Sequence, residues 1–422
     1  MDCRLSRRAH SKGTHVVTWD NFLQESLDEA QEQGLLRTRV ARSLRHHAIL
    51  GNCSENLVNF ASNDYLGLSR NGEVCRRAHE ILIAAELGAG ASPLVSGYTV
   101  KHQELERALA EFQQAEAAVV FSSGYACNLG VVASLVGSDD AVLSDRLNHA
   151  SLIDGCRLSG ARIFVYPHGD ADFVRKFLVG QRQRFRRVLI ISESIFSMDG
   201  DAAPLKDLAS IAQQYDSGLA VDEAHATGVY GIRGAGLIEE LGLSDQVLVK
   251  LGTLSKAIGG VGGFVAGSSA LCNFVVNRCR SYVYSTALPA SCAAAAIESV
   301  RQITLLANER NELRRTAQSL RCTLSGLGWQ VPDGDSPIIP VIVGDEELAM
   351  EIAQRLRQRG FLVPAIRPPT VPRATSRLRI SLSTQHDQEA IDRFVTALES
   401  SRDGLLQRHP QIAKSKLATN ER

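Results

Sequence analysis

Short apolar runs recur through the middle of the chain, separated by stretches with helical periodicity. Each run has three to five residues, is apolar almost throughout and is bounded by turn residues or charges, which indicates a strand buried on both faces. Such strands are typical of a mainly parallel sheet covered by helices. The pattern therefore predicts an α/β fold. The runs are Ala117–Phe121, Ala141–Leu143, Arg162–Tyr166, Val188–Ile191, Leu219–Val221 and Val247–Leu251.

The pattern changes on either side of this region. Before it we expect a helix at Trp19–Gly34, a short strand at Leu57–Phe60 and a helix at His102–Gln114. A further helix is expected at Asn128–Val136, after the first apolar run. After about residue 299 the periodicity predicts a smaller α+β lobe. Its expected elements are one long polar helix at Arg301–Leu327, strands at Ile338–Val343 and Arg377–Ser383, and helices at Glu346–Arg359 and Gln388–Leu398.

These changes suggest five segments. They are a polar N-terminal extension (1–18), an N-terminal segment (19–60), a large domain (61–298), a small C-terminal domain (299–400) and a polar, frayed tail (401–422). The extension lacks the apolar stretch of a secretory signal.

Composition narrows the class of protein. The 422 residues contain 46 Lys and Arg against 46 Asp and Glu, so a nucleic acid or an anionic membrane is not an expected partner. The nine cysteines are scattered, with no Cys-x-x-Cys pair and no zinc-type cluster, which predicts reduced thiols, a cytoplasmic location and no metal site. No apolar run approaches the length of a membrane helix.

Polar residues that can carry chemistry follow five of the predicted strands. Functional groups of open α/β sheets collect at the carboxyl ends of the strands. Any one of these positions has an ordinary structural explanation, but the five together do not. The segments are Ser122–Tyr125, Ser144–His149, Glu193–Gly200, Asp222–His225 and Gly252–Lys256.

The same residue types satisfy the needs of pyridoxal 5'-phosphate (PLP). This cofactor needs an amine for an imine bond, a carboxylate against its pyridine nitrogen, donors around its phosphate and a flat group over its ring. Lys256 supplies the amine and Asp222 the carboxylate. His149 is the expected stacking group, and His225 can reach the phenolic oxygen. The expected phosphate donors are Gly124, Tyr125, Ser197 and Thr253, the first two at a helix N-terminus.

Other interpretations account for these residues one at a time. Lys256 alone would be a solvated surface charge, Asp222 a helix N-cap, and His149 and His225 satisfied histidines. Asp222-Glu223-Ala224-His225 also spells a helicase signature, but the chain has no Gly-Lys dipeptide and therefore no P-loop. No Gly-x-Ser-x-Gly elbow of a serine hydrolase is present. A non-enzymatic binding module would not need this set of groups.

Seven segments together resemble the α-oxoamine synthases, a branch of the fold-type I PLP enzymes. The resemblance spans about Trp19 to Leu398 and implies a fold-type I transferase that joins an amino acid to an acyl thioester with loss of CO2. The segments are Asn63–Gly67, Val95–Tyr98, Phe121–Asn128, Ser144–Ala150, Phe196–Asp201, Val221–His225 and Thr253–Lys256.

The resemblance also implies substrates and further site residues. Within the family, Ala365–Pro372 is most similar to the members that condense L-alanine with a pimeloyl thioester, whose carrier is coenzyme A or acyl carrier protein. A sibling synthase that uses glycine and an acetyl thioester is the alternative. Arg379 matches the arginine that binds the amino-acid carboxylate, and Thr370 a substrate-contacting threonine. Arg37, with Arg39 as the alternative register, matches an acyl-substrate contact, and His149 is also expected beside the substrate. The family is homodimeric, so we expect a homodimer.

Overall fold

The computed structural model describes residues 18–32, 35–37, 39, 41, 49–50, 54–55 and 57–406. The chain divides into two units, Met1–Asn56 and Leu57–Arg422. The first contains helix α1 (Trp19–Glu32) and a two-stranded antiparallel pair of β1 (Ile49–Leu50) and β2 (Ser54–Glu55). The helix predicted at Trp19–Gly34 is therefore confirmed. Most of the predicted N-terminal extension and residues 407–422 of the predicted tail lie outside the described residues.

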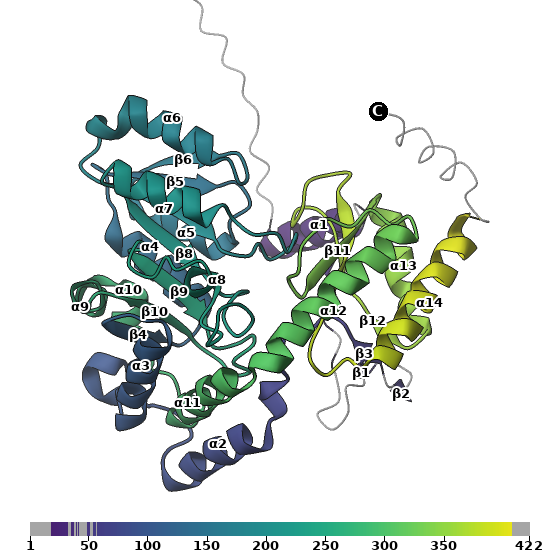
Figure 1. Cartoon of the computed structure of the whole chain (residues 1–422), viewed down its shortest axis with the longest axis horizontal. Coiled ribbons are helices and arrows are strands. Elements are labelled where there is room, and N and C mark those ends of the chain that lie inside the picture. The colour runs from purple at the N-terminus through teal and green to yellow at the C-terminus, as the bar shows by residue number, and fades with distance from the viewer. Residues whose placement is uncertain are drawn as a thin grey trace, which may run out of the picture. The chain divides into compact units, whose positions relative to one another are not determined.

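A seven-stranded sheet organises the second unit, with strand order β4-β10-β9-β8-β7-β5-β6 (Figure 1). Neighbouring strands from β9 to β6 are parallel, whereas β10 is antiparallel to both β4 and β9. The α/β class with a mainly parallel central sheet is confirmed. The strands are β4 (Ala117–Phe121), β5 (Ala141–Asp145), β6 (Arg162–Tyr166), β7 (Val188–Glu193), β8 (Gly218–Asp222), β9 (Val249–Thr253) and β10 (Gly263–Gly267).

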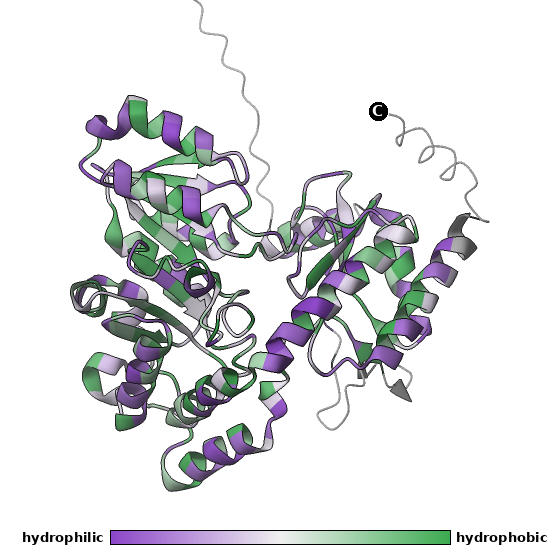
Figure 2. Ribbon diagram, viewed as in Figure 1, coloured by the Kyte–Doolittle hydropathy of each residue, from purple (hydrophilic) through white to green (hydrophobic). Residues whose placement is uncertain are grey.

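Both faces of this sheet are covered from β4 to β5, which explains why these strands are largely apolar. The edge strand β6 is exposed along most of its length, unlike the burial on both faces that its apolar run predicted. In β7, Leu189 and Ile191 join a core cluster with side chains of α4, α5 and α9, whereas Val188 and Ile190 join the opposite cluster with α3, α6 and α7. Figure 2 shows the strands as hydrophobic and the helices as mixed. The helices of this unit before residue 290 are α2 (Gly72–Ala84), α3 (Val100–Phe112), α4 (Gly124–Leu135), α5 (Ala150–Ser159), α6 (Ala171–Gln181), α7 (Leu205–Gln214), α8 (Leu237–Glu240), α9 (Ser269–Arg278) and α10 (Arg280–Val283).

A smaller antiparallel sheet, in the order β11-β14-β13, forms the C-terminal part. Short β12 pairs in parallel with β3 (Val58–Asn59), so the strand predicted at Leu57–Phe60 is also present. The elements are α11 (Ala290–Leu305), α12 (Ala307–Gly326), β11 (Ile338–Gly344), α13 (Glu346–Gln358), β12 (Phe361–Leu362), β13 (Ala365–Ile366), β14 (Ser376–Ser381) and α14 (Gln388–Leu406). The predicted α+β lobe is therefore present.

Three further details of the prediction are wrong. The helix predicted at Arg301–Leu327 is two helices, because Leu306 leaves the helical conformation at φ −92° and ψ 36°. The buried Arg310 guanidinium donates to the Ile303 carbonyl at the end of α11, which stabilises this break. Strand β10 was not predicted, because its glycines lie in what looked like a loop. The tail was predicted to fray from residue 401, but α14 continues to Leu406.

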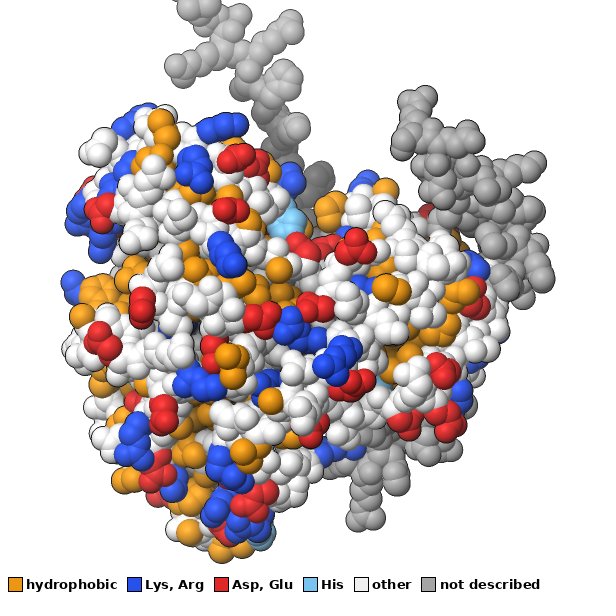
Figure 3. Space-filling model, viewed as in Figure 1, with side chains coloured by type: hydrophobic (Ala, Val, Ile, Leu, Met, Phe, Trp, Pro, Cys, Tyr) orange, Lys and Arg blue, Asp and Glu red, His pale blue; other side chains and the backbone are white. Residues whose placement is uncertain are grey.

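Charged side chains of both signs are interspersed over the face shown in Figure 3. None of the helices in the described ranges combines the length and apolar character needed to cross a membrane.

Candidate active site

The parallel strands β5, β7, β8 and β9 end at one edge of the large sheet, and the predicted site residues lie at these ends. Lys256 follows β9, and its Nζ lies 2.8 Å from Nε2 of His225, which follows β8. Asp222 is the last residue of β8. The structure therefore brings together the predicted amine, carboxylate and one of the two predicted histidines.

Burial lowers the pKa values of Lys256 and His225. Burial lowers the pKa of Lys256 to about 8, although the charges of Asp222 and Glu193 partly oppose this effect. Burial, together with the charges of Lys256 and Arg379, holds the pKa of His225 well below its usual range. The imidazole is therefore neutral near pH 7 and can accept a hydrogen bond from the Lys256 ammonium.

A tyrosine that the sequence analysis did not assign completes this chain of contacts. The Tyr65 hydroxyl lies 2.6 Å from Nδ1 of His225, across 160 positions of sequence. Burial raises the pKa of Tyr65 to about 12, although Arg379 lowers it in part. The phenol thus stays protonated and fixes the orientation of the His225 ring. Its position in Asn63–Gly67, one of the segments that resemble the family, was the available signal.

Asp222 is held by two donors. Its Oδ2 accepts from the Asn128 side chain at 2.6 Å, and its Oδ1 accepts from the Ala224 amide at 2.8 Å. Asn128 lies on α4 and also donates to the hydroxyl of Ser151, so it joins the carboxylate to α5. Sequence reasoning missed Asn128 as a site residue, because only the fold places this amide beside β8.

Glu193 is a second buried acid at this edge. It ends β7 and pairs in register with Asp222 on β8. Burial raises the pKa of Glu193 to about 8, and the Asp222 charge adds to the effect. Its buried Oε1 has no hydrogen-bond partner among the described residues. The Glu193 carboxyl and the Lys256 amine influence each other's pKa.

His149 caps α5 with its ring. The Nδ1 atom accepts from the Ser151 amide at 3.2 Å and lies 2.7 Å from the Ser151 hydroxyl. Burial of the ring nitrogens lowers the pKa of His149, although the residue as a whole is exposed. Since the exposed ring is neutral and its orientation is fixed, it presents a flat surface on which an aromatic ligand can stack.

Helix α4 begins at this edge, with the predicted phosphate donors Gly124 and Tyr125 in its first turn. Ser123 caps it by accepting from the Ala126 amide, which leaves the first amides, those of Gly124 and Tyr125, at the positive end of the helix dipole. A Cβ atom on Gly124 would lie 3.1 Å from Thr253 Oγ1. The start of α4 and the lysine loop therefore meet closely.

Thr253 makes its contacts through its side-chain hydroxyl, whereas Ser197 contacts Arg379 through its backbone carbonyl. The Thr253 hydroxyl donates to the Gly262 carbonyl at 3.0 Å and accepts from the Ser255 amide, so it shapes the lysine loop. The Ser197 carbonyl accepts from Arg379 Nε at 2.6 Å. Arg379 is buried on β14 and also donates to the Asn63 side chain. This arginine therefore lies beside the cluster, and its predicted role in binding the amino-acid carboxylate stays a prediction.

Two further predicted substrate contacts are not tested by this geometry. Thr370 is an exposed residue between β13 and β14, and its amide donates to the Arg367 carbonyl. Arg37 is exposed in the unit Met1–Asn56, which is described by itself. The roles of both residues therefore stay predictions.

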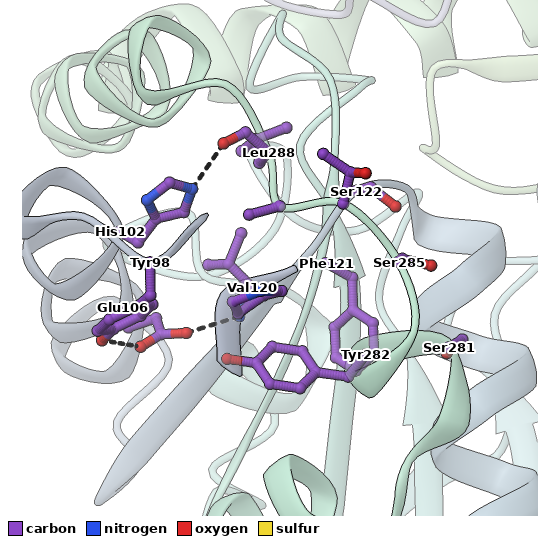
Figure 4. A pocket seen from close by; sticks show the side chains of 13 residues that line it. Tyr98, His102, Glu106, Val120, Phe121, Ser122, Ser281, Tyr282, Ser285 and Leu288 are labelled. Atoms are coloured by element: carbon purple, nitrogen blue, oxygen red, sulfur yellow. Dashed lines mark hydrogen bonds between the residues drawn. The ribbon is translucent and has the colours of Figure 1, made fainter. Parts of the chain in front are cut away.

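A separate pocket lies beside β4 (Figure 4) and is lined by Tyr98, His102, Glu106 and Tyr282 among others. The Tyr98 hydroxyl donates to Glu106, which also accepts from the Val120 amide, and His102 Nε2 lies 2.6 Å from the Leu288 carbonyl. These groups satisfy one another and join α3 to the sheet. The residues that line this pocket include no lysine, so we assign the chemistry to Lys256 and its neighbours.

The cluster has the donor set that PLP requires. It offers an amine with a lowered pKa, a fixed buried carboxylate, an exposed imidazole and the amides of a helix N-terminus. The residues present therefore fit this cofactor.

Comparison with known proteins gives the class. Residues 55–398 match the family model described as aminotransferase class I and II, so the chain belongs to this class of PLP-dependent enzymes. A serine palmitoyltransferase from S. paucimobilis, solved with bound PLP and myriocin, superposes with a TM-score of 0.84 at 28% identity, covering 91% of this chain and 97% of that one.

Within this class the chain belongs to the 8-amino-7-oxononanoate synthase family. It is 46% identical over 342 residues to the 8-amino-7-oxononanoate synthase of Anaeromyxobacter dehalogenans, covering 81% of this chain and 85% of that protein. The crystal structure of the Francisella tularensis enzyme of that name superposes with a TM-score of 0.72 at 26% identity, covering 83% of this chain and 99% of that one. The predicted family and its cofactor are confirmed.

Proposed function

We propose that this protein condenses L-alanine with a pimeloyl thioester to give 8-amino-7-oxononanoate, CO2 and the free carrier thiol. The observation that carries the proposal is the Lys256 amine, 2.8 Å from a neutral His225 and close to the held carboxylate of Asp222. The name carried by relatives that are up to 46% identical supports the choice of substrates.

Lys256 is the residue that we assign to imine formation with the cofactor and to proton transfer at the α-carbon of alanine. Bound PLP supplies an electron sink for the negative charge at that carbon. A lowered pKa keeps part of the Lys256 population neutral near pH 8, as a base requires. Asp222 is assigned to the pyridine nitrogen, and His225, oriented by Tyr65, to the phenolic oxygen.

The remaining predicted residues are assigned to binding. The amides of Gly124 and Tyr125 and the hydroxyls of Ser197 and Thr253 would hold the phosphate, since all four lie at one sheet edge. His149 would stack on the ring and contact the thioester carbonyl. Arg379 would bind the alanine carboxylate through its planar fork. Thr370 and Arg37 complete the proposed substrate contacts.

The proposal includes a homodimer that works in the cytoplasm. Exposed apolar side chains are concentrated between residues 82 and 100, and a second copy is the proposed cover for them. The seven free cysteines in the described ranges suit a reducing compartment. We assign cofactor binding to residues 61–298 and Arg379 to a smaller domain at 299–400.

A sibling synthase is the second candidate. The serine palmitoyltransferase has the higher TM-score of the two structures compared, 0.84 against 0.72. Backbone similarity reports the shared fold, whereas substrate choice depends on side chains. We therefore weigh the 46% sequence identity more heavily.

The test is a substrate panel on the PLP-loaded protein. Thiol and CO2 release is measured with L-alanine, glycine or L-serine, each combined with pimeloyl-, acetyl- or palmitoyl-CoA, and with pimeloyl acyl carrier protein. We expect turnover with L-alanine and a pimeloyl donor. A preference for acetyl or palmitoyl donors would assign the protein to a sibling synthase.

Lys256→Ala serves as the loss-of-function control. Because it removes the amine, we expect turnover to fall by at least about 100-fold while the fold is retained. Lys206→Ala removes an exposed lysine of α7 and should leave turnover unchanged. Equal activity of the two variants would refute the role of Lys256.

A further inference from the structure

His168 lies outside the cluster around Lys256 but contacts two carboxylates that border it. The residue follows β6. Its Nδ1 lies 3.0 Å from Asp145 Oδ1, and its Nε2 lies 2.8 Å from Asp201 Oδ2. The ring stands nearly perpendicular to that of Phe196, with centroids 4.3 Å apart. His168 is thus held on both nitrogens and on one face.

This geometry requires a doubly protonated ring. Only an imidazolium can donate from both nitrogens to two carboxylates. Burial lowers the pKa of His168, but the hydrogen bonds and charges of Asp145 and Asp201 outweigh this effect and raise it to about 10. His168 is therefore a fixed cation over the physiological pH range.

The two carboxylates belong to different segments of the candidate active site. Asp145 ends β5 and stands four residues before His149, the proposed stacking group. It also accepts from the amides of Leu147 and Gly169, so its position is well defined. Asp201 stands four residues after Ser197, the proposed phosphate donor.

The segment around Ser197 is a closed loop. The Phe196 amide donates to the Asp201 carbonyl at 3.0 Å, and the Gly200 amide donates to the Phe196 carbonyl at 2.8 Å. Asp201 and Ser197 therefore belong to one compact turn. A displacement of Asp201 would be transmitted to Ser197.

The other side of this loop is held from β14. Arg377 is buried and forms an ion pair with Asp199, and Arg379 donates to the Ser197 carbonyl.

Glu193 also lies between the loop and the segment that carries His149, because its amide donates to the Asn148 side chain at 3.2 Å and backbone groups of His149 and Ser197 lower the pKa of its carboxyl in part. His168 adds a second connection, through Asp145 and Asp201 at the outer ends of the two segments.

We propose that His168 is a positioning residue that joins the Asp145–His149 segment to the Phe196–Asp201 loop, and so sets the separation of His149 and Ser197 across the bound cofactor. The inference rests on the proposed roles of those two residues. Removal of His168 would leave Asp145, which is buried, without its cation, and an unpaired buried charge is costly, so we expect the side chain to move. The connection between Asp145 and Asp201 would then be lost, and the separation of His149 and Ser197 would be less well defined.

The test is PLP affinity of the apoprotein, measured by titration of the visible absorption of the bound cofactor. His168→Gln should weaken PLP binding on the order of tenfold, because displacement of a positioned group by about 1 Å can cost up to about 100-fold. Asp201→Asn keeps the shape of the partner and removes its charge, and should weaken binding in the same direction. His79→Gln changes an exposed histidine on α2 and should leave binding unchanged.

Thermal unfolding of the apo variants separates positioning from general stability. Reduced stability of both His168→Gln and Asp201→Asn with unchanged PLP affinity would overturn the proposal. If His168→Gln does not fold, the affinity of Asp201→Asn decides the question. Failure of the wild-type protein to bind PLP would instead refute the proposed function, so the two failures are distinguishable.

Discussion

At the scale of single residues, the site depends on charges that burial has shifted away from their ordinary values. Lys256 has a lowered pKa and His168 a raised one, although both are basic residues with buried contacts. The difference lies in their neighbours. Lys256 contacts a neutral imidazole, and the charges of Asp222 and Glu193 only partly offset the effect of its burial. His168 contacts two carboxylates directly. The same fold thus makes one amine reactive and one imidazole permanently charged.

The pKa of Lys256 predicts how cofactor uptake depends on pH. Only the neutral amine attacks an aldehyde, so the rate of PLP uptake by the apoprotein should rise with pH and be half-maximal near pH 8. Stopped-flow absorbance measures this rate. Asp222→Asn removes a charge that favours the ammonium form and should move the midpoint to lower pH. A midpoint near the ordinary lysine value of about 10.4 would contradict the assignment.

The pKa of His168 predicts a dependence of stability on pH. Its pKa is raised on folding from an ordinary value of about 6.5 to about 10. The stabilisation is therefore complete below about pH 6.5 and disappears as the pH rises towards 10. The melting temperature of His168→Gln should lie furthest below that of the wild type at pH 6, and the gap should narrow by pH 10. A gap that widens with pH would exclude the imidazolium.

At the scale of elements, close backbone packing joins α4 to β10. A Cβ atom on Gly263 would lie 2.6 Å from Gly124 Cα, which is backbone and cannot turn aside. Gly263→Ala should therefore lower the free energy of unfolding by about 1–3 kcal/mol and weaken PLP binding by displacing the start of α4. Denaturant unfolding and PLP titration measure the two effects. Gly137→Ala, with no atom within 4 Å of the new methyl group, is the matched control.

Sequence patterns predicted these elements to an uneven extent. Buried strands such as Ala117–Phe121 were predicted with their observed bounds, because a strand covered on both faces must be apolar. Strand β10 was missed, because a run that begins and ends with glycine looks like a loop. Gly263 and Gly267 are needed there because a larger side chain would clash with Gly124 of α4 and Leu271 of α9. The break at Leu306 was missed, because Arg310 stabilises it from another turn without any proline or glycine.

The residues of the candidate site could also be predicted only in part from the sequence. The groups that follow strands, such as Lys256 and Asp222, could be predicted from order along the chain. Tyr65, Asn128 and the contacts of His168 could not be derived this way, because they bring together positions far apart in sequence. Resemblance to a family identified the segment that contains Tyr65, but only geometry gave its partner.

At the scale of the whole molecule, exposed apolar side chains between residues 82 and 100 favour self-association. The set includes Leu87 and Val95, each 79% exposed. We expect a dimer in sedimentation velocity, and Val95→Glu should shift it towards monomer, because a charge buried at the interface is costly. Val179→Glu, at an exposed apolar position on α6, is the control. A wild-type monomer, or a Val95→Glu dimer as stable as the wild type, would contradict this surface assignment.

The position of β10 has a consequence for how the protein loses structure. Gly263 pairs with Thr253 on one side and with Phe121 on the other, so the loop that carries Lys256 is closed at its base by the central sheet. Inside it, the Leu254 amide donates to the Gly262 carbonyl and the Gly260 amide to the Leu254 carbonyl. The loop therefore cannot open without opening the sheet. In hydrogen exchange, the Leu254 amide should exchange only with global unfolding, so the reactive amine should keep its place until the sheet itself is lost.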